Sequence, residues 1–108
     1  MSYNVFTIPP FDRQLKRLVK KFPSLKTEYA QLIERLETNP LQGAIITNNC
    51  YKIRVAIKSK GKGKSVGTRV IAHVQVIKSK VFLLTIYDKS EQDDITNSEI
   101  NYLLSFID

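Results

Sequence analysis

The chain has 108 residues, of which 17 are Lys or Arg and 10 are Asp or Glu, so its net charge is +7. This length fits one domain, and 43% hydrophobic residues with only four Gly and four Pro exclude a disordered or fibrous protein. One Cys and one His exclude an internal disulfide and a Cys/His zinc site, and apolar runs of three or four residues exclude a membrane-spanning segment. We therefore expect one domain over residues 1–108, in the cytoplasm and without a signal sequence.

The first third of the chain predicts a strand followed by two helices. Residues 3–8 resemble a short strand that ends at Pro9 and Pro10, which fit the first turn of a helix. Apolar residues recur at helical spacing from 11 to 22 and again from 25 to 36, and Pro23 separates the two runs. The two segments therefore form a helical hairpin with one shared apolar side.

Beyond residue 50 the apolar period changes from 3.6 to 2, which indicates strands. Residues 51–57 place Lys52 and Arg54 on the polar face of a first strand. Residues 68–77 and 80–87 predict two more strands, joined by a tight hairpin at 78–79. A loop rich in Gly and Lys precedes the second of these strands, and a capping box at Thr96 and Glu99 begins a last helix. The predicted order is β-α-α-β-β-β-α.

Charge is distributed unevenly along the chain. Residues 38–87 contain nine basic side chains and no acid, whereas residues 88–108 contain one base and six acids. A long stretch without a carboxylate presents a positive field to a polyanion before contact is made. The distribution favours a nucleic-acid partner and leaves open an anionic membrane, another acidic partner, or a solvated basic face.

Two phosphate-binding templates fail in the Gly/Lys loop. Residues 63–65 match the end of the P-loop pattern, but Lys58 stands where its first Gly is needed. The dinucleotide pattern fails at Val66, and a strand follows the loop where both motifs require a helix. The acid-free half also lacks the carboxylates of a two-metal nuclease, and Cys50 is interpreted as a core thiol. We expect neither a metal nor a cofactor.

Cationic side chains can still support one kind of chemistry. RNA carries its own nucleophile, the 2′-hydroxyl, so its cleavage needs a base, a group that stabilises charge on phosphorus, and an acid. Lys52, Arg54, Arg69 and Lys89 lie in or next to strands that can bring them into one concavity, although alternating cations on a strand can also simply face water. His73 is a candidate base, although the sequence favours a packing or solvent role for a lone strand histidine.

The segments CYKIRVAIKSKGKGKSVGTRVIAHV and VFLLTIYDKSEQDDIT, preceded by LKRLVKKFPSLKTEYAQLIERLETNP, resemble the RelE/ParE superfamily of bacterial toxin-antitoxin toxins, in its RelE/HigB-like branch. The resemblance runs from about residue 11 to residue 104. It implies an α+β, RelE-like fold in which an N-terminal strand and a two-helix hairpin pack on a small, mainly antiparallel sheet, as one toxin domain over residues 1–108.

The resemblance also implies an activity and partners. RelE-type members are metal-independent mRNA endoribonucleases that inhibit translation at the ribosome. A cognate antitoxin silences them, and operator DNA is bound only through the antitoxin complex. The ParE-like alternative inhibits DNA gyrase without cutting RNA, and a non-catalytic, basic nucleic-acid-binding module is a further alternative.

Family positions imply the site residues. Lys52 and Arg54 match the basic pair on a strand, Arg69 the phosphate-stabilising arginine, and Lys89 the basic residue after the last strand. Ser90 replaces the next basic residue, and Ile95 stands near the place of the family's late tyrosine, for which Tyr87 is the nearest substitute. We also expect a second set of residues to bind RNA through contacts that do not depend on its sequence: Lys58, Lys60, Lys62, Lys64 and His73.

Overall fold

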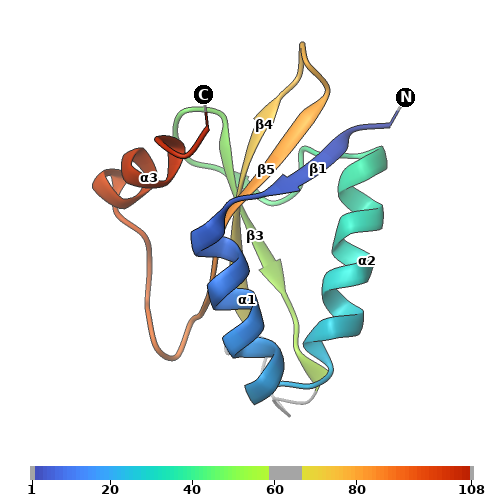
Figure 1. Ribbon diagram of the computed structural model, residues 1–108, viewed down its shortest axis with the longest axis vertical. Coiled ribbons are helices and arrows are strands. Elements are labelled where there is room, and N and C mark those ends of the chain that lie inside the picture. The colour runs from blue at the N-terminus through green and yellow to red at the C-terminus, as the bar shows by residue number, and fades with distance from the viewer. Residues whose placement is uncertain (1, 59–66, 108) are drawn as a thin grey trace.

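The computed structural model describes residues 2–58 and 67–107, and their strands form one five-stranded sheet of order β1-β5-β4-β3-β2 (Figure 1). The strands are β1 (Asn4–Thr7), β2 (Ala44–Ile45), β3 (Cys50–Val55), β4 (Thr68–Gln75) and β5 (Lys80–Asp88). The helices are α1 (Pro9–Lys21), α2 (Leu25–Thr38) and α3 (Asn97–Leu104). The α+β architecture expected from the sequence is confirmed, with the short strand β2 as an addition that the apolar pattern did not predict.

The sheet is mixed because its first strand pairs in parallel with its last. Asn4 of β1 lies beside Lys80 of β5, and the pairing continues in step to Thr7 and Leu83. The other neighbouring strands pair antiparallel. Helices α1 and α2 fill the long connection between β1 and β2, with both prolines in the first turn of α1 as predicted.

Helices α1 and α2 cover one face of the sheet and bury the main core. Their apolar residues meet the alternating residues of the strands, such as Ile53 and Val55 of β3, which are 4% exposed. The buried core residues of these two helices are Phe11, Leu18, Leu25, Leu32 and Leu36. Within residues 2–58 and 67–107, no helix is both long enough and apolar enough to cross a bilayer.

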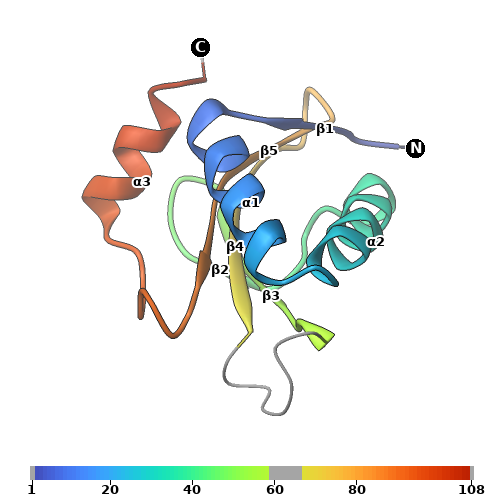
Figure 2. The same cartoon turned by 60° about the horizontal axis from the view of Figure 1, so that its bottom comes forward.

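The opposite face of the sheet carries the predicted basic residues, and we call it the basic face. Residues two apart on a strand share a face, as do residues directly opposite on neighbouring strands. Lys52 and Arg54 therefore share this face with Arg69 and His73 of β4. Asp94, in the segment before α3, forms an ion pair with Lys52 on this face. In Figure 2, α3 and α2 lie on different sides of β4 and β5.

Two sequence predictions, the turn between β4 and β5 and the capping box of α3, can be compared with the structure. The hairpin between β4 and β5 is longer than the predicted two-residue turn, because β4 ends at Gln75 and Ser79 takes a φ of 54°. The capping box is confirmed: the Thr96 hydroxyl accepts a hydrogen bond from the Glu99 backbone N–H at 3.1 Å. The Glu99 carboxylate accepts one from the Thr96 backbone N–H at 3.2 Å.

Candidate functional site

A pocket of about 400 Å³ opens at one end of the basic face. Strand pairing explains its composition, because the β3 and β4 register sets Arg54 opposite Arg69, with Lys52 two residues along β3. Lys89 follows β5 directly and completes the set, so the structure brings together four of the five predicted catalytic side chains. The lining residues are Arg35, Gln42, Gly43, Ala44, Lys52, Ile53, Arg54, Arg69, Lys89 and Asp93.

Arg69 is the buried cation of this pocket, with 5% of its surface exposed. Its guanidinium donates a hydrogen bond to the Thr68 carbonyl oxygen at 3.3 Å. No carboxylate in the described part of the chain lies within 4.0 Å of it, and its cross-strand neighbour, Arg54, carries the same charge. Burial of an uncompensated charge is costly, and like charges opposite each other repel. An anion bound in the pocket would relieve both costs.

Lys52 has a carboxylate partner in the same region. Its ammonium group lies 3.0 Å from the Asp94 carboxylate, and the Ile95 backbone N–H donates to the same oxygen at 2.8 Å. The Ile95 hydrogen bond, followed by the Lys52 hydrogen bond, lowers the pKa of Asp94. Asp94 therefore stays ionised and ties the segment between β5 and α3 to the basic face.

Tyr87 is buried next to Arg69 and does not line the pocket. It stands opposite Arg69 in the β4–β5 register and is 4% exposed. Among the described residues its hydroxyl has no hydrogen-bond partner. Burial raises the pKa of the phenol, and the nearby Asp94 carboxylate raises it further. Tyr87 is consequently a protonated donor at neutral pH.

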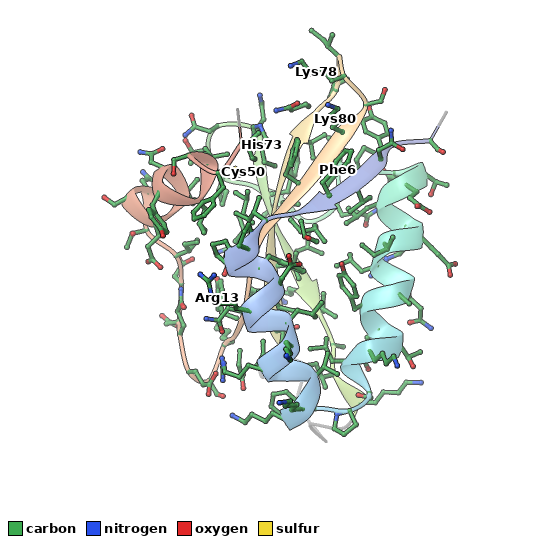
Figure 3. All side chains as sticks on the ribbon, in the orientation of Figure 1. Phe6, Arg13, Cys50, His73, Lys78 and Lys80 are labelled. Carbon is green, nitrogen blue, oxygen red and sulfur yellow. The ribbon has the colours of Figure 1, made fainter. Side chains whose placement is uncertain are left out.

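His73 lies elsewhere on the basic face. It pairs with Cys50, four residue pairs beyond the Arg54 and Arg69 pair, which corresponds to ~13 Å along the strands. Its Nδ1 lies 2.8 Å from the Asn48 carbonyl oxygen, so Nδ1 carries the proton and donates it there. Figure 3 shows Cys50 and His73 side by side.

Cys50 is a core thiol, as predicted. It is fully buried, and its Sγ lies 3.8 Å from Nδ1 of His73. Burial raises the pKa of the thiol to about 11, so the group stays protonated at neutral pH.

The predicted RNA-binding lysines are distributed differently from the catalytic set. Lys58 is exposed and does not line the pocket, and its backbone N–H donates to the Glu28 carboxylate at 2.8 Å. Lys60, Lys62 and Lys64 lie outside the described residues. Their predicted role stays a prediction.

Three polar lining residues were missed by the sequence analysis: Arg35, Gln42 and Asp93. Arg35 lies in the last turn of α2, and Gln42 lies in the connection to β2. Asp93 belongs to the acidic segment after β5, for which the sequence analysis proposed no role in the site, yet it lines the pocket. The three residues lie in separate segments, and the local sequence pattern of each segment does not indicate that it contacts the others. No signal in the sequence could therefore have predicted that they line one pocket.

Gly43 shapes the same rim of the pocket. Its φ is 78°, in the left-handed region, and a Cβ built there would collide with the Lys52 backbone carbonyl oxygen. The glycine therefore allows the chain before β2 to lie directly against β3, beside Lys52. Within residues 2–58 and 67–107, no three His, Cys, Asp or Glu side chains gather as a metal site would require.

Comparisons with known proteins match one family by sequence and two solved structures by fold. The sequence model of the family described as the RelE toxin of the RelE/RelB toxin-antitoxin system matches residues 11–106. The fold is similar to a double mutant of E. coli toxin RelE in the free state, with a TM-score of 0.61, 17% identity and 99% of both chains covered. It is also similar to the toxin-antitoxin complex RelBE2 from Mycobacterium tuberculosis, with a TM-score of 0.61, 16% identity, and 82% of this chain and 99% of that chain covered.

Proposed function

The chain belongs to the RelE family of toxins from toxin-antitoxin systems, and from this premise we propose that it is a metal-independent endoribonuclease that cuts mRNA on the ribosome. The observation that carries the proposal is Arg69, a buried cation with a second arginine opposite and no carboxylate partner in the described residues. A phosphodiester bound there supplies the missing negative charge.

In the proposed reaction the RNA supplies the nucleophile. The 2′-oxygen forms a bond to the adjacent phosphorus, and the bond from phosphorus to the 5′-oxygen breaks. The products are a 2′,3′-cyclic phosphate and a 5′-hydroxyl. Negative charge on the phosphate oxygens grows during the attack, and Arg69, Arg54 and Lys52 stabilise it from the pocket walls, with Lys89 on the β5 side.

The two proton transfers are assigned to groups at the same end of the sheet. Asp93 is the one carboxylate among the described lining residues and takes the proton of the 2′-hydroxyl. Tyr87, whose raised pKa keeps its phenol protonated, gives a proton to the departing 5′-oxygen. Because Tyr87 is buried and does not line the pocket, this step requires the segment that Asp94 ties down to move when RNA enters.

The family also suggests the protein's partners. We propose that a cognate antitoxin inhibits it in the cytoplasm, since the similar RelBE2 structure is a toxin-antitoxin complex, and that operator DNA is reached only through such a complex. The RelE/HigB-like branch, rather than the ParE-like one, is the proposed assignment within the superfamily. An acidic antitoxin segment would complement the net charge of +7.

Single-turnover cleavage on mRNA-programmed ribosomes tests the proposal, with the cuts mapped by primer extension. The wild-type protein is expected to cut within codons without added metal beyond what the ribosomes need. Arg69→Ala should lose at least a hundredfold in saturating rate, whereas Arg13→Ala, an exposed arginine on α1, should cut like the wild type. Intact mRNA together with loss of gyrase supercoiling would support the ParE-like alternative. RNA binding with neither effect would leave a basic binding module.

A further inference from the structure

Arg35 is a pocket residue whose side chain has no partner among the described residues. It lies in the last turn of α2, where its backbone carbonyl oxygen accepts hydrogen bonds from the Asn39 backbone N–H and the Thr38 hydroxyl. Its exposed guanidinium forms no ion pair or side-chain hydrogen bond with any other described residue. The backbone of Arg35 therefore makes hydrogen bonds at the end of α2, while its charged side chain lines the pocket and is available to a ligand.

The pocket is wider than one phosphate group. Its lining runs from Lys89, after β5, to Ala44 in β2, and the sheet order places three strand spacings between β5 and β2. At ~4.8 Å for each spacing this is ~14 Å. Arg69 and Lys89 lie on the β4 and β5 side, whereas Arg35 lines the pocket from outside the sheet, on α2, which is followed along the chain by β2.

The charges in the pocket also exceed what one phosphodiester needs. Five basic residues and one acid line it, and a phosphodiester carries a single negative charge. Gln42, the neighbour of Arg35 at the rim, brings no charge, and its amide donates to the Asn39 carbonyl oxygen at 2.8 Å. On the β2 side Arg35 is thus the cation that α2 adds for a second anionic group.

We propose that Arg35 binds the phosphate next to the scissile one and makes the pocket specific for an RNA chain that continues past the β2 edge. This inference rests on the proposed function, since it places the scissile phosphate at Arg69. Arg35 is a specificity-determining residue in this assignment. It contributes binding energy equally to the bound RNA and to the transition state, so its loss raises the half-saturating concentration and leaves the saturating rate unchanged.

A structural role for Arg35 makes a different prediction. A cation in the last turn of a helix also stabilises the carbonyl end of the helix dipole. If that were its role, Arg35→Ala would lower the melting temperature and would not respond to the charge of the RNA. Arg35→Lys keeps the positive charge at both places and should restore most of the binding.

The test uses mRNAs that carry one neutral methylphosphonate linkage, either one step 5′ or one step 3′ of the scissile phosphate. With unmodified mRNA on programmed ribosomes, Arg35→Ala should raise the half-saturating concentration about fivefold and reduce the salt slope of binding by about one. With one of the two neutral linkages, the wild type and Arg35→Ala should bind equally. Arg13→Ala is the matched control, because Arg13 is also an exposed helical arginine but does not line this pocket.

Separate outcomes contradict the inference and the proposed function. Arg35→Ala behaving like Arg13→Ala, or retaining its penalty with both neutral linkages, would overturn the role of Arg35. Arg69→Ala cutting at the wild-type rate would overturn the proposed function. Fluorescence anisotropy with the same RNAs, carrying a 2′-deoxy group at the cleavage position, measures the Arg35 contact even if the wild-type protein does not cut.

Discussion

Arg54 on β3 and Arg69 on β4 stand directly opposite each other, and Arg69 is the buried member of the pair. Two like charges at such a position destabilise a sheet, and nearby carboxylates do not offset them within the described residues. A pair of this kind is expected where the charge serves a ligand rather than the fold.

Replacing Arg69 should therefore stabilise the protein while abolishing its activity. Arg69→Met keeps much of the apolar volume and removes the buried charge, so we expect the free energy of unfolding to rise by about 1 kcal/mol. Urea denaturation measures the change, and ribosomal cleavage should be lost in the same variant. A large loss of stability would mean that Arg69 stabilises the fold, and it would contradict the role of Arg69 as a cation held for a bound anion.

Anions should stabilise the wild-type protein through the same residue. Sulfate or a short oligonucleotide that binds the folded pocket raises the melting temperature in proportion to its occupancy. The increase should be much smaller in Arg69→Met than in Arg13→Ala, whose substitution leaves the pocket lining intact. Equal increases in both variants would indicate nonspecific effects of the salt.

Removing the Asp94 carboxylate should strengthen RNA binding. In the free protein the Asp94 carboxylate forms an ion pair with the Lys52 ammonium at 3.0 Å, so an RNA phosphate must compete with Asp94 for Lys52. Asp94→Asn removes that competition, and the ion pair is exposed, so the gain should be at most about fivefold. Binding isotherms at low and high salt test this, and weaker binding by Asp94→Asn would instead show that the ion pair organises the pocket.

Tyr87→Phe should separate stability from catalysis. The Tyr87 hydroxyl is buried without a partner among the described residues, so its removal should change stability by less than about 1 kcal/mol, in the stabilising direction. The saturating cleavage rate should fall by about a hundredfold if the phenol is the proton donor. Normal cleavage by Tyr87→Phe would move that role to another group.

The same substitution predicts a pH dependence of stability. Burial raises the pKa of Tyr87 above its ordinary value of 10.0, so above that pH the unfolded chain ionises before the folded protein does. The wild-type protein should therefore lose stability as the pH rises from 10, and Tyr87→Phe should lose less. Below pH 10 the two stabilities should change in parallel.

Gly43→Ala should damage the pocket rim. The left-handed φ of 78° and the contact with the Lys52 carbonyl oxygen leave no room for a Cβ. We expect a loss of at least about 1 kcal/mol, because a substitution at an incompatible φ destabilises by more than the entropy it saves. An unchanged melting temperature would show that the segment before β2 can shift without cost.

The sequence predicts the elements of this fold well where one pattern dominates. The 3.6 period of α1 and α2 and the 2-residue period of β3 each reflect one buried face. Strand β2 escaped prediction because its two residues are both exposed and too few to alternate. In β4, residues 68–72 are all buried, since both faces of that strand are covered, so alternation there says little about which side chain faces which way.

The candidate site was predictable only in part for a related physical reason. Lys52 and Arg54 show their shared face in the β3 pattern, but the burial of Arg69 depends on what packs over β4. Arg35 and Asp93 reach the pocket from distant parts of the chain. His73 shares the basic face, yet the strand register separates it from the pocket. The amino-acid composition gives no information about that distance.

The parallel pairing of β1 with β5 has a consequence for how the protein is made. The first strand of the chain can find its neighbour only after the last strand has been synthesised, and α1 packs mainly on that same last strand. The apolar side of α1 thus remains uncovered on the nascent chain until residues 80–88 emerge, which makes folding a late event with long-range contacts. Lys89 and Asp93 emerge later still. Newly made protein therefore acquires its charged pocket only after residue 93 has emerged from the ribosome.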